Sequence, residues 1–242
     1  MMQKRVYELF HKALVELEET MDDVIDEAAW VVFDRIVAGG AAHIYDTGHL
    51  VDRELVHRAG GLALWRPLRW TLEVENPVRQ RREKRRAPDV GTIIRCVLDA
   101  SRVARGDVLV IGSVSGASET VVELARAARE RGVFVIAVTS PAYSRELESS
   151  HASGKRLFQV ADLVIDNGAP YGDAALAVEG LKENIVPVSG IGAVTALWAL
   201  SAGIVQRLIE SGRTPSVYAS VNRPDTRDFN ERSEERYERH GW

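Results

Sequence analysis

A buried strand that runs into a helix through a hydroxyl-rich turn is the feature that most limits how this chain can fold. Residues 107–111 are apolar after Asp107 and are bounded by Gly106 and Gly112, which is typical of a strand buried on both faces. Apolar residues with helical spacing follow over residues 119–131. Between the two lies a turn composed mainly of serine, threonine, glycine and alanine. A strand–turn–helix unit of this kind favours a parallel α/β sheet.

The same turn predicts a site for a phosphate group. A helix N-terminus leaves backbone N–H groups unpaired, and the helix dipole favours an anion there. The segment also supplies hydroxyl donors around Gly116, namely Ser113, Ser115, Ser118 and Thr120. A single hydroxyl, that of Ser118, is sufficient to cap the helix. We therefore predict a site for phosphate or a phosphorylated sugar, with simple N-capping by Ser118 as the alternative.

Other strands and helices alternate along the chain. Apolar residues with helical spacing occur over residues 6–36, 51–58, 91–103 and 190–209. Apolar runs typical of strands occur over residues 43–45, 62–65, 133–138 and 163–165. Residues 217–219 are a candidate edge strand. This alternation predicts an α/β fold with helices on both faces of a parallel sheet. We divide the chain into a helical N-terminal segment (1–38), an α/β domain (39–222) and a charged tail (223–242) that is either a surface helix or disordered. The N-terminal helix docks either on its own domain or on a second subunit.

Three turns with similar chemistry follow predicted strands. They are Thr47-Gly48-His49, the serine-rich turn, and Thr139-Ser140. Ligands of open parallel sheets collect beyond the carboxyl ends of the strands, so these turns are expected to meet at one site.

Composition excludes several classes of protein. The net charge of −4 gives no general attraction to nucleic acid or acidic membranes, and one cysteine, Cys96, allows no intrachain disulfide. Residues 185–205 are uncharged and long enough to raise the question of a membrane span, but Pro187, Ser189, Gly190, Gly192 and Ser201 interrupt them. The basic run at 79–86 is either a solvated surface or a collar that attracts anions. We expect a cytoplasmic protein that binds neither membrane nor nucleic acid.

Several motifs resemble the sugar isomerase (SIS) domain family. They are the turn at residues 47–49, the turn at residues 113–120, and Ile136-Ala137-Val138-Thr139-Ser140. Further motifs are similar to a single-SIS, phosphoheptose-isomerase-like branch: Arg58-Ala59-Gly60-Gly61-Leu62-Ala63, His151-Ala152-Ser153-Gly154-Lys155, Ala161-Asp162, Asp166-Asn167-Gly168, Gly172-Asp173 and Val178-Glu179-Gly180. The resemblance implies a three-layer α/β/α sandwich with a five-stranded parallel sheet that binds phosphorylated sugars.

The resemblance also implies roles for particular residues. Ser113, Ser115, Gly116, Ser118 and Thr120 correspond to the phosphate-binding turn. Thr47, Gly48 and His49 border the sugar, as do Thr139 and Ser140. Two departures from the family pattern each remove a side chain that could contact a ligand: Leu50 stands where many relatives have serine, and Ala117 follows the Ser-x-Ser-Gly motif.

An aldose–ketose isomerase needs a carboxylate that removes a proton and a donor near the carbonyl oxygen. The resemblance makes Glu54 the candidate base, since phosphoheptose isomerases carry a catalytic glutamate on this helix. A solvated carboxylate is the alternative. His49 in the turn is the candidate acid, and His57 lies on the same helix face as Glu54. Both histidines have structural alternatives. Weaker candidates are His151 in a substrate-closing loop, Glu73, Glu75 and Glu179.

The predicted function is therefore phosphosugar binding, with isomerisation through an enediol as its chemistry. The alternatives are a non-catalytic sugar-phosphate sensor and an amino-sugar phosphate lyase or etherase. The set Asp46, His49, Asp52 and His57 matches no dedicated metal motif, and we expect neither a metal nor a cofactor. Nucleotide-binding glycine motifs are absent from the sequence. We expect a homodimer or a higher homo-oligomer.

Overall fold

Five parallel strands form the central sheet of the computed structural model. The structure describes residues 1–48, 51–73, 75, 89–224 and 226–242, and for residues 51 and 52 it describes only the backbone. The strands are β1 (Ala42–Asp46), β2 (Trp65–Pro67), β3 (Val108–Gly112), β4 (Phe134–Thr139) and β5 (Leu163–Asp166), in the order β2-β1-β3-β4-β5. The register places Asp46 beside Gly112 and Gly112 beside Val138. The carboxyl ends of β1, β3 and β4 therefore meet at one edge, and the predicted α/β/α sandwich is confirmed.

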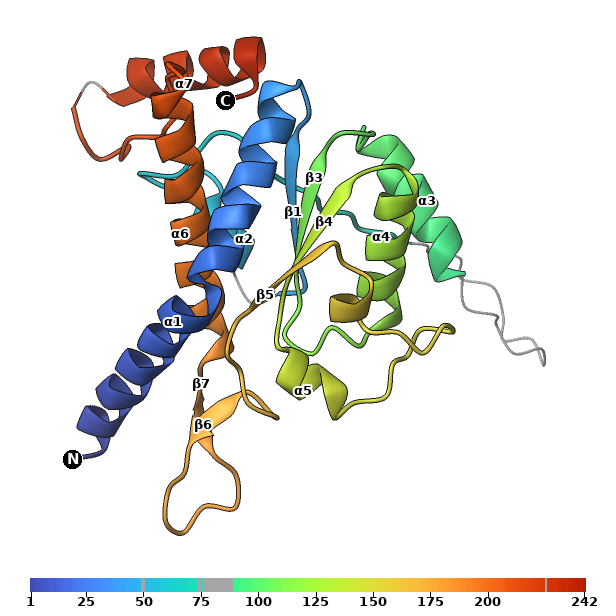
Figure 1. Ribbon diagram of the computed structural model, residues 1–242, viewed down its shortest axis with the longest axis vertical. Helices are drawn as coiled ribbons and strands as arrows, with labels where there is room; N and C mark the ends of the chain where they lie inside the picture. The colour runs from blue at the N-terminus through green and yellow to red at the C-terminus, as the bar shows by residue number, and fades with distance from the viewer. Residues whose placement is uncertain (49–50, 74, 76–88, 225) are drawn as a thin grey trace.

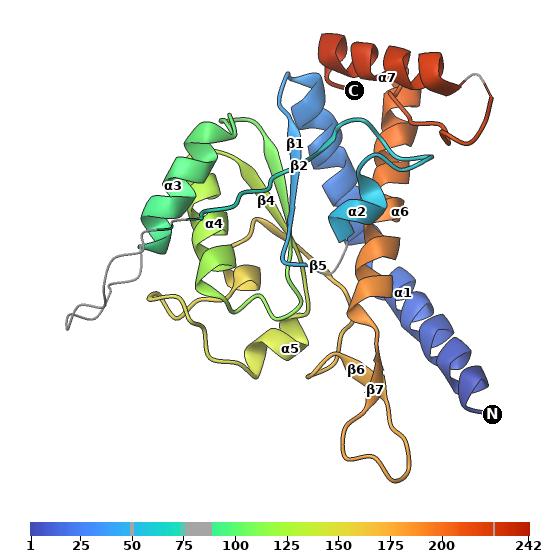
Figure 2. The ribbon, with the colours of Figure 1, turned by 180° about the vertical axis from the view of Figure 1, so that it is seen from behind.

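Helices cover both faces of this sheet (Figures 1 and 2). One face carries α1 (Met2–Val37), α6 (Ser189–Glu210) and the short α2 (Val51–Leu55). The other carries α3 (Val90–Ala100) and α4 (Glu119–Glu130). Successive residues of β3 contribute to opposite faces, Val108 and Val110 to the first and Leu109 and Ile111 to the second. Every residue of β3 is buried, as its unbroken apolar run predicts.

The N-terminal helix is continuous and docks on its own domain through its second half. Ala28, Ala29, Val32 and Ile36 are fully buried against the rest of this face. The first half of α1 is mostly exposed and extends away from the sheet beside the hairpin of β6 (Ala174–Leu176) and β7 (Ile185–Pro187) (Figure 1). Of the two docking alternatives for this helix, the structure supports the first for its second half.

Helix α6 is long and apolar enough to cross a membrane by length and composition. In this fold it is a core helix. Its residues Ala196, Leu197, Leu200 and Ile204 are fully buried in the layer that it forms with α1. Burial of this side against the sheet accounts for its apolar sequence.

The structure corrects the prediction at the second strand. Residues 62–64 are buried but form a turn, because Leu62 makes an isolated bridge to Val217 and the Ala63 N–H donates to the Ser216 carbonyl. Strand β2 begins only at Trp65. Residues 217–219 contribute that single bridge and no strand. The charged tail forms a helix, α7 (Thr226–His240).

Candidate functional site

The turn at residues 113–120 is held in place by its carbonyl groups. The Val114 carbonyl accepts hydrogen bonds from the Ser140 N–H at 3.0 Å and the Thr139 hydroxyl at 3.1 Å. The Ser115 carbonyl accepts one from the Ser144 hydroxyl. The next two carbonyls accept from the N–H groups of Leu157 and Ser150, at 2.8 and 2.9 Å. All these donors come from α5 (Pro141–Arg145), from η1 (Leu157–Gln159) and from the chain around them.

The amide groups of the same turn are left open. In a trans peptide the N–H points opposite to the preceding carbonyl, so the amides of residues 115–118 point away from α5 and η1. Within the described chain, no backbone N–H of residues 114–121 donates to a protein acceptor. Ser118 is the N-cap residue of α4, but its side chain makes no capping hydrogen bond. The turn thus presents a row of free donors at a helix N-terminus, an arrangement suited to an anion.

Gly116 is required for this shape. Its φ of +55° lies in the left-handed region. A Cβ atom at this position would lie 2.9 Å from Leu157 Cβ and 3.0 Å from Thr139 Oγ1. Any larger residue would push the turn away from the segment that holds its carbonyls.

A cavity of about 590 Å³ opens beside the turn, at the carboxyl end of β1. Thr47, Gly48 and Thr120 line it, together with the cations Arg53 of α2 and Arg69. Thr47 joins the two parts of the site, because its N–H and hydroxyl both donate to the Gly112 carbonyl, at 3.1 and 3.3 Å. Hereafter we call this space the β1 cavity.

An aromatic pair and a carboxylate complete the β1 cavity. Tyr45 and Trp70 line it and stack with their ring centres 4.7 Å apart. Burial raises the pKa of the Tyr45 hydroxyl, and the neighbouring Asp46 raises it further. Asp46 is the one carboxylate among the described residues that line the cavity. Gly112 makes room for it, since a Cβ there would lie 2.9 Å from Asp46 Oδ1.

The structure brings some of the predicted binding residues together at this cavity and leaves others apart. Thr47, Gly48 and Thr120 lie on the β1 cavity, and Ser113 lines a small space behind it beside Asp46. Ser115 and Ser118 belong to the turn with the free amides but do not line the β1 cavity. Their contact with a ligand remains a prediction.

Thr139 and Ser140 are engaged inside the protein. Both are fully buried. The Thr139 hydroxyl donates to the Val114 carbonyl, and the Ser140 hydroxyl donates to the Ala169 carbonyl at 2.6 Å while it accepts from the Tyr143 N–H. Direct contact with a ligand would require these bonds to break, so in this structure both hydroxyls support the site from behind.

The catalytic residues predicted on the second helix, Glu54 and His57, lie away from the β1 cavity, and α2 ends at Leu55, so that His57 lies beyond the helix. Glu54 accepts a hydrogen bond from Arg58 at 3.1 Å, one turn along the chain, and neither residue lines the cavity. The His57 side chain is 61% exposed, packs against the Tyr218 ring and lies 4.0 Å from Glu234. His49 lies outside the described residues. The catalytic roles of all three stay predictions.

The weaker candidates also lie elsewhere. The His151 ring is buried against α4, with Nε2 3.0 Å from the Glu123 carboxylate. Glu73, Glu75 and Glu179 are exposed. Among the described residues no group of three His, Cys, Asp or Glu side chains could hold a metal. Of the set Asp46, His49, Asp52 and His57, for which the sequence predicts no metal, His49 and the Asp52 side chain lie outside the described residues. The basic run at 79–86 lies outside the described residues too.

Sequence reasoning missed the two cations of the β1 cavity. Arg53 lies in the helix after the first turn, three residues beyond Leu50, and Arg69 follows Pro67 at the end of β2. Arg69 could have been found from the sequence, because it follows the carboxyl end of a strand, where parallel sheets bind their ligands. Arg53 has no local signal, because one exposed arginine on a short helix is ordinary.

The chain was compared with family models, with curated relatives and with solved structures. The family model described as "SIS domain" matches residues 7–140, so the match begins inside α1. A UPF0309 protein of Shouchella clausii is 34% identical over 239 residues, which cover 97% of this chain and 96% of the relative.

Solved structures share the fold at low sequence identity. A phosphoheptose isomerase from Neisseria gonorrhoeae superposes with a TM-score of 0.53 at 18% identity, covering 85% of this chain and 100% of that one. The Vibrio vulnificus NanR protein complexed with ManNAc-6P gives a TM-score of 0.52 at 13% identity, covering 99% of this chain and 69% of that one.

Proposed function

The chain belongs to the SIS-domain family, as a relative of the UPF0309 proteins, and on that premise we propose that it binds a phosphorylated sugar at the turn and the β1 cavity. One observation carries the proposal. The amides of residues 114–121 have no acceptor among the described residues, and they lie beside a cavity that contains two arginines. Open backbone donors at a helix N-terminus and guanidinium groups are what a phosphate dianion needs.

Each part of the site has a role in this proposal. The phosphate accepts hydrogen bonds from the amides of the turn and from the hydroxyls of Ser115, Ser118 and Thr120. Arg53 and Arg69 neutralise its charge from the cavity side. The sugar lies toward Thr47, against the wall formed by Tyr45 and Trp70. NanR complexed with ManNAc-6P is a fold neighbour with such a ligand.

For the chemistry we propose aldose–ketose isomerisation. A carboxylate removes the proton from the carbon beside the carbonyl while a donor protonates the carbonyl oxygen, and an enediol forms. The neighbouring hydroxyl then loses its proton, and the carboxylic acid, which exchanges with solvent, delivers a proton to the former carbonyl carbon. Asp46 is the carboxylate that the described part of the cavity offers for this step, and His49 remains the candidate donor to the carbonyl oxygen.

A second candidate is a sensor that binds the sugar phosphate without converting it. The observation in its favour is the position of the expected catalytic residues. Glu54 pairs with Arg58, and His57 lies beside Tyr218 and Glu234. A protein that kept only the binding half of the site would retain the turn and have no need of these two side chains.

The binding proposal is tested by calorimetric titration of the full chain with hexose and heptose phosphates. We expect saturable binding of at least one phosphate ester and none of the corresponding free sugar. Replacing Ser115 with alanine or Thr120 with valine should weaken binding by about 1–3 kcal/mol, roughly 5- to 150-fold. Thr195→Val on the exposed side of α6 is the matched control and should bind normally. Equal affinity for wild-type and both site variants would overturn the proposal.

Isomerisation is tested on any sugar phosphate that binds. The complex is incubated in deuterated water, and the carbon beside the carbonyl is followed by NMR. Incorporation of deuterium that is lost in Asp46→Asn, with the phosphate still bound, supports an enediol step. Tight binding without exchange at high protein concentration supports the sensor instead.

A further inference from the structure

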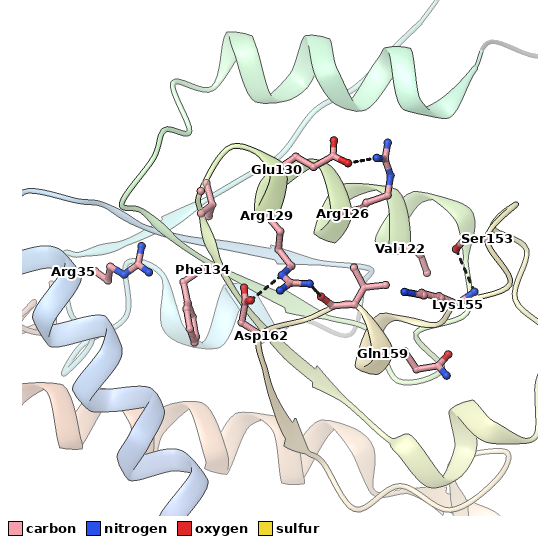
Figure 3. A pocket seen from close by; sticks show the side chains of 13 residues that line it. Arg35, Val122, Arg126, Arg129, Glu130, Phe134, Ser153, Lys155, Gln159 and Asp162 are labelled. Carbon is pink, nitrogen blue, oxygen red and sulfur yellow. Dashed lines mark hydrogen bonds and ion pairs between the residues drawn. The ribbon is translucent and has the colours of Figure 1, made fainter.

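A groove of about 580 Å³ lies beside α4 at the amino ends of β4 and β5 (Figure 3), whereas the β1 cavity lies at the carboxyl end of β1. It runs along α4 and η1 to the beginnings of β4 and β5, where Phe134 and Asp162 line it. The two spaces share no lining residue among those described. Hereafter we call it the α4 groove.

Four cationic side chains line the α4 groove, and two of them are already neutralised. Arg126 forms hydrogen-bonded ion pairs with Glu123, at 2.7 and 2.8 Å, and with Glu130. Arg129 donates to Asp162 and to the Val160 carbonyl, both at 2.8 Å. These pairs fix the middle of the groove, as the dashed contacts of Arg129 in Figure 3 show.

The other two cations have no such partner. In the described parts of the chain, no carboxylate lies within ion-pair distance of Arg35 or Lys155. Arg35 lies over the Phe134 ring at 5.5 Å from its centre. Figure 3 shows Arg35 at one end of the groove and Lys155 at the other. The groove therefore has an open cationic group at each end.

A third open donor lies near Lys155. The Gln159 side-chain oxygen accepts a hydrogen bond from the Arg156 N–H at 2.9 Å, so its NH₂ group is the part left to interact with a ligand. Gln159 lines the groove together with Lys155. Unmatched donors of this kind favour a ligand rich in acceptor oxygens.

The wall that carries Lys155 is held firmly against α4. Glu123 is buried and contacts His151 Nε2 at 3.0 Å, and His151 Nδ1 lies 2.7 Å from the Ser153 hydroxyl. The Ser149 hydroxyl donates to the Lys155 carbonyl at 2.6 Å. A site with ordered walls loses little conformational entropy when a ligand binds.

We propose that the α4 groove binds an organic anion with a charged group at each end, such as a bisphosphorylated sugar. One phosphate contacts Lys155 and Gln159, and the other contacts Arg35. The sugar lies over the Arg129–Asp162 pair between them. The volume falls within the range of small-molecule sites. This site is separate from the phosphosugar site proposed above and does not depend on it.

The test is calorimetric titration of the full chain with fructose 1,6-bisphosphate, alongside fructose 6-phosphate. We expect saturable binding of the bisphosphate that Lys155→Met and Arg35→Met each weaken by about tenfold or more. Thr120→Val in the β1 cavity should leave this binding unchanged. Lys182→Met, which removes an exposed lysine elsewhere, is the matched control for net charge.

Three results would overturn the proposal. The bisphosphate fails to bind, or Lys182→Met weakens binding as much as Lys155→Met, or the bisphosphate is displaced by fructose 6-phosphate and lost in Thr120→Val. The last result would assign the bisphosphate to the β1 cavity and support the phosphosugar proposal instead. If none of the hexose and heptose monophosphates bound while bisphosphate binding stayed intact, only the proposed function would be contradicted. Melting temperatures of all variants confirm that they are folded.

Discussion

Hydroxyl groups that look alike in the sequence serve opposite purposes in the fold. Thr47 and Thr120 face the β1 cavity. Thr139, Ser140 and Ser144 are fully buried and donate to main-chain carbonyls. The hydroxyls of Thr139 and Ser144 hold the carbonyls of residues 114 and 115 inward, so the following amides point outward. Buried hydroxyls are thus responsible for the donors that a phosphate would meet.

The His43–Asp107 pair shows how one buried carboxylate joins several segments. Asp107 accepts hydrogen bonds from the N–H groups of Ala41 and Ala104, at 2.8 and 2.9 Å, and lies 3.0 Å from His43 Nε2. We expect Asp107→Asn to lower the free energy of unfolding by about 1–3 kcal/mol at neutral pH, because an amide replaces one acceptor oxygen with a donor. Urea denaturation measures the change.

Asp99→Asn is the control for that variant. Asp99 is 70% exposed and pairs with Arg131 on the surface. Its loss should change stability by less than about 1 kcal/mol. Equal losses for Asp107→Asn and Asp99→Asn would contradict the structural role of Asp107.

The same residue predicts a pH dependence. Burial raises the pKa of Asp107, but hydrogen bonds from His43 and from the amides of Ala104 and Ala41 outweigh it and bring the pKa below its ordinary value of 3.8. A lowered folded-state pKa stabilises the protein above the unfolded-state pKa, and this stabilisation is lost as the pH falls through the folded-state value. The stability difference between wild-type and Asp107→Asn should therefore be constant near neutral pH and narrow below about pH 4. If the stability difference between wild-type and Asp107→Asn widened as the pH fell, the lowered pKa of Asp107 would be contradicted.

At the scale of elements, α1 and α6 pack closely because a glycine lies where they cross. A Cβ at Gly203 would lie 2.8 Å from the Ala29 Cβ, which cannot move without shifting the α1 backbone. We expect Gly203→Ala to destabilise the protein by about 1–3 kcal/mol through overpacking, even though alanine favours a helix by about 1 kcal/mol. Urea denaturation measures the balance of the two effects.

Gly190 in the same helix supplies the matched control. A Cβ there meets nothing within 4 Å. Gly190→Ala should therefore stabilise the protein by about 0.5–1 kcal/mol. If both substitutions were stabilising, the close approach of α1 and α6 would not hold in solution.

At the scale of the whole molecule, α7 ties the end of the chain to strand β2. Glu234 accepts hydrogen bonds from Arg66 at 2.9 Å and from the Tyr218 hydroxyl, and the Arg66 guanidinium lies 3.8 Å from the centre of the Tyr237 ring. Burial raises the pKa of Tyr218, and the bond to Glu234 raises it further, so the hydroxyl remains the donor.

We expect Glu234→Ala to loosen α7 and not the sheet. Amide hydrogen exchange within residues 226–240 should become roughly 5- to 150-fold faster, equivalent to about 1–3 kcal/mol, while exchange in β3 and β4 stays unchanged. Glu231→Ala removes an exposed ion pair with Arg227 on the same helix and should have little effect. Faster exchange throughout the chain would mean that α7 is part of the cooperative core.

Local patterns were sufficient to predict the sandwich, most of its strands and helices, and the open backbone amides of the turn. Burial on one or both faces imposes a period on the residues of each element, and the first N–H groups of a helix have no partner within the helix in any fold. The sequence also indicated Thr47, Gly48 and Thr120, which do line one cavity.

The remaining features depend on contacts between segments that are distant along the chain. Arg53 and Arg69 meet at the β1 cavity, Thr139 and Ser140 turn inward, and His57 lies beside α7 instead of facing the cavity. The start of β2 depends on the bridge between Leu62 and Val217. No period or motif records such pairings, because the direction of a side chain and the partner that it meets are fixed only when the helices and strands pack together.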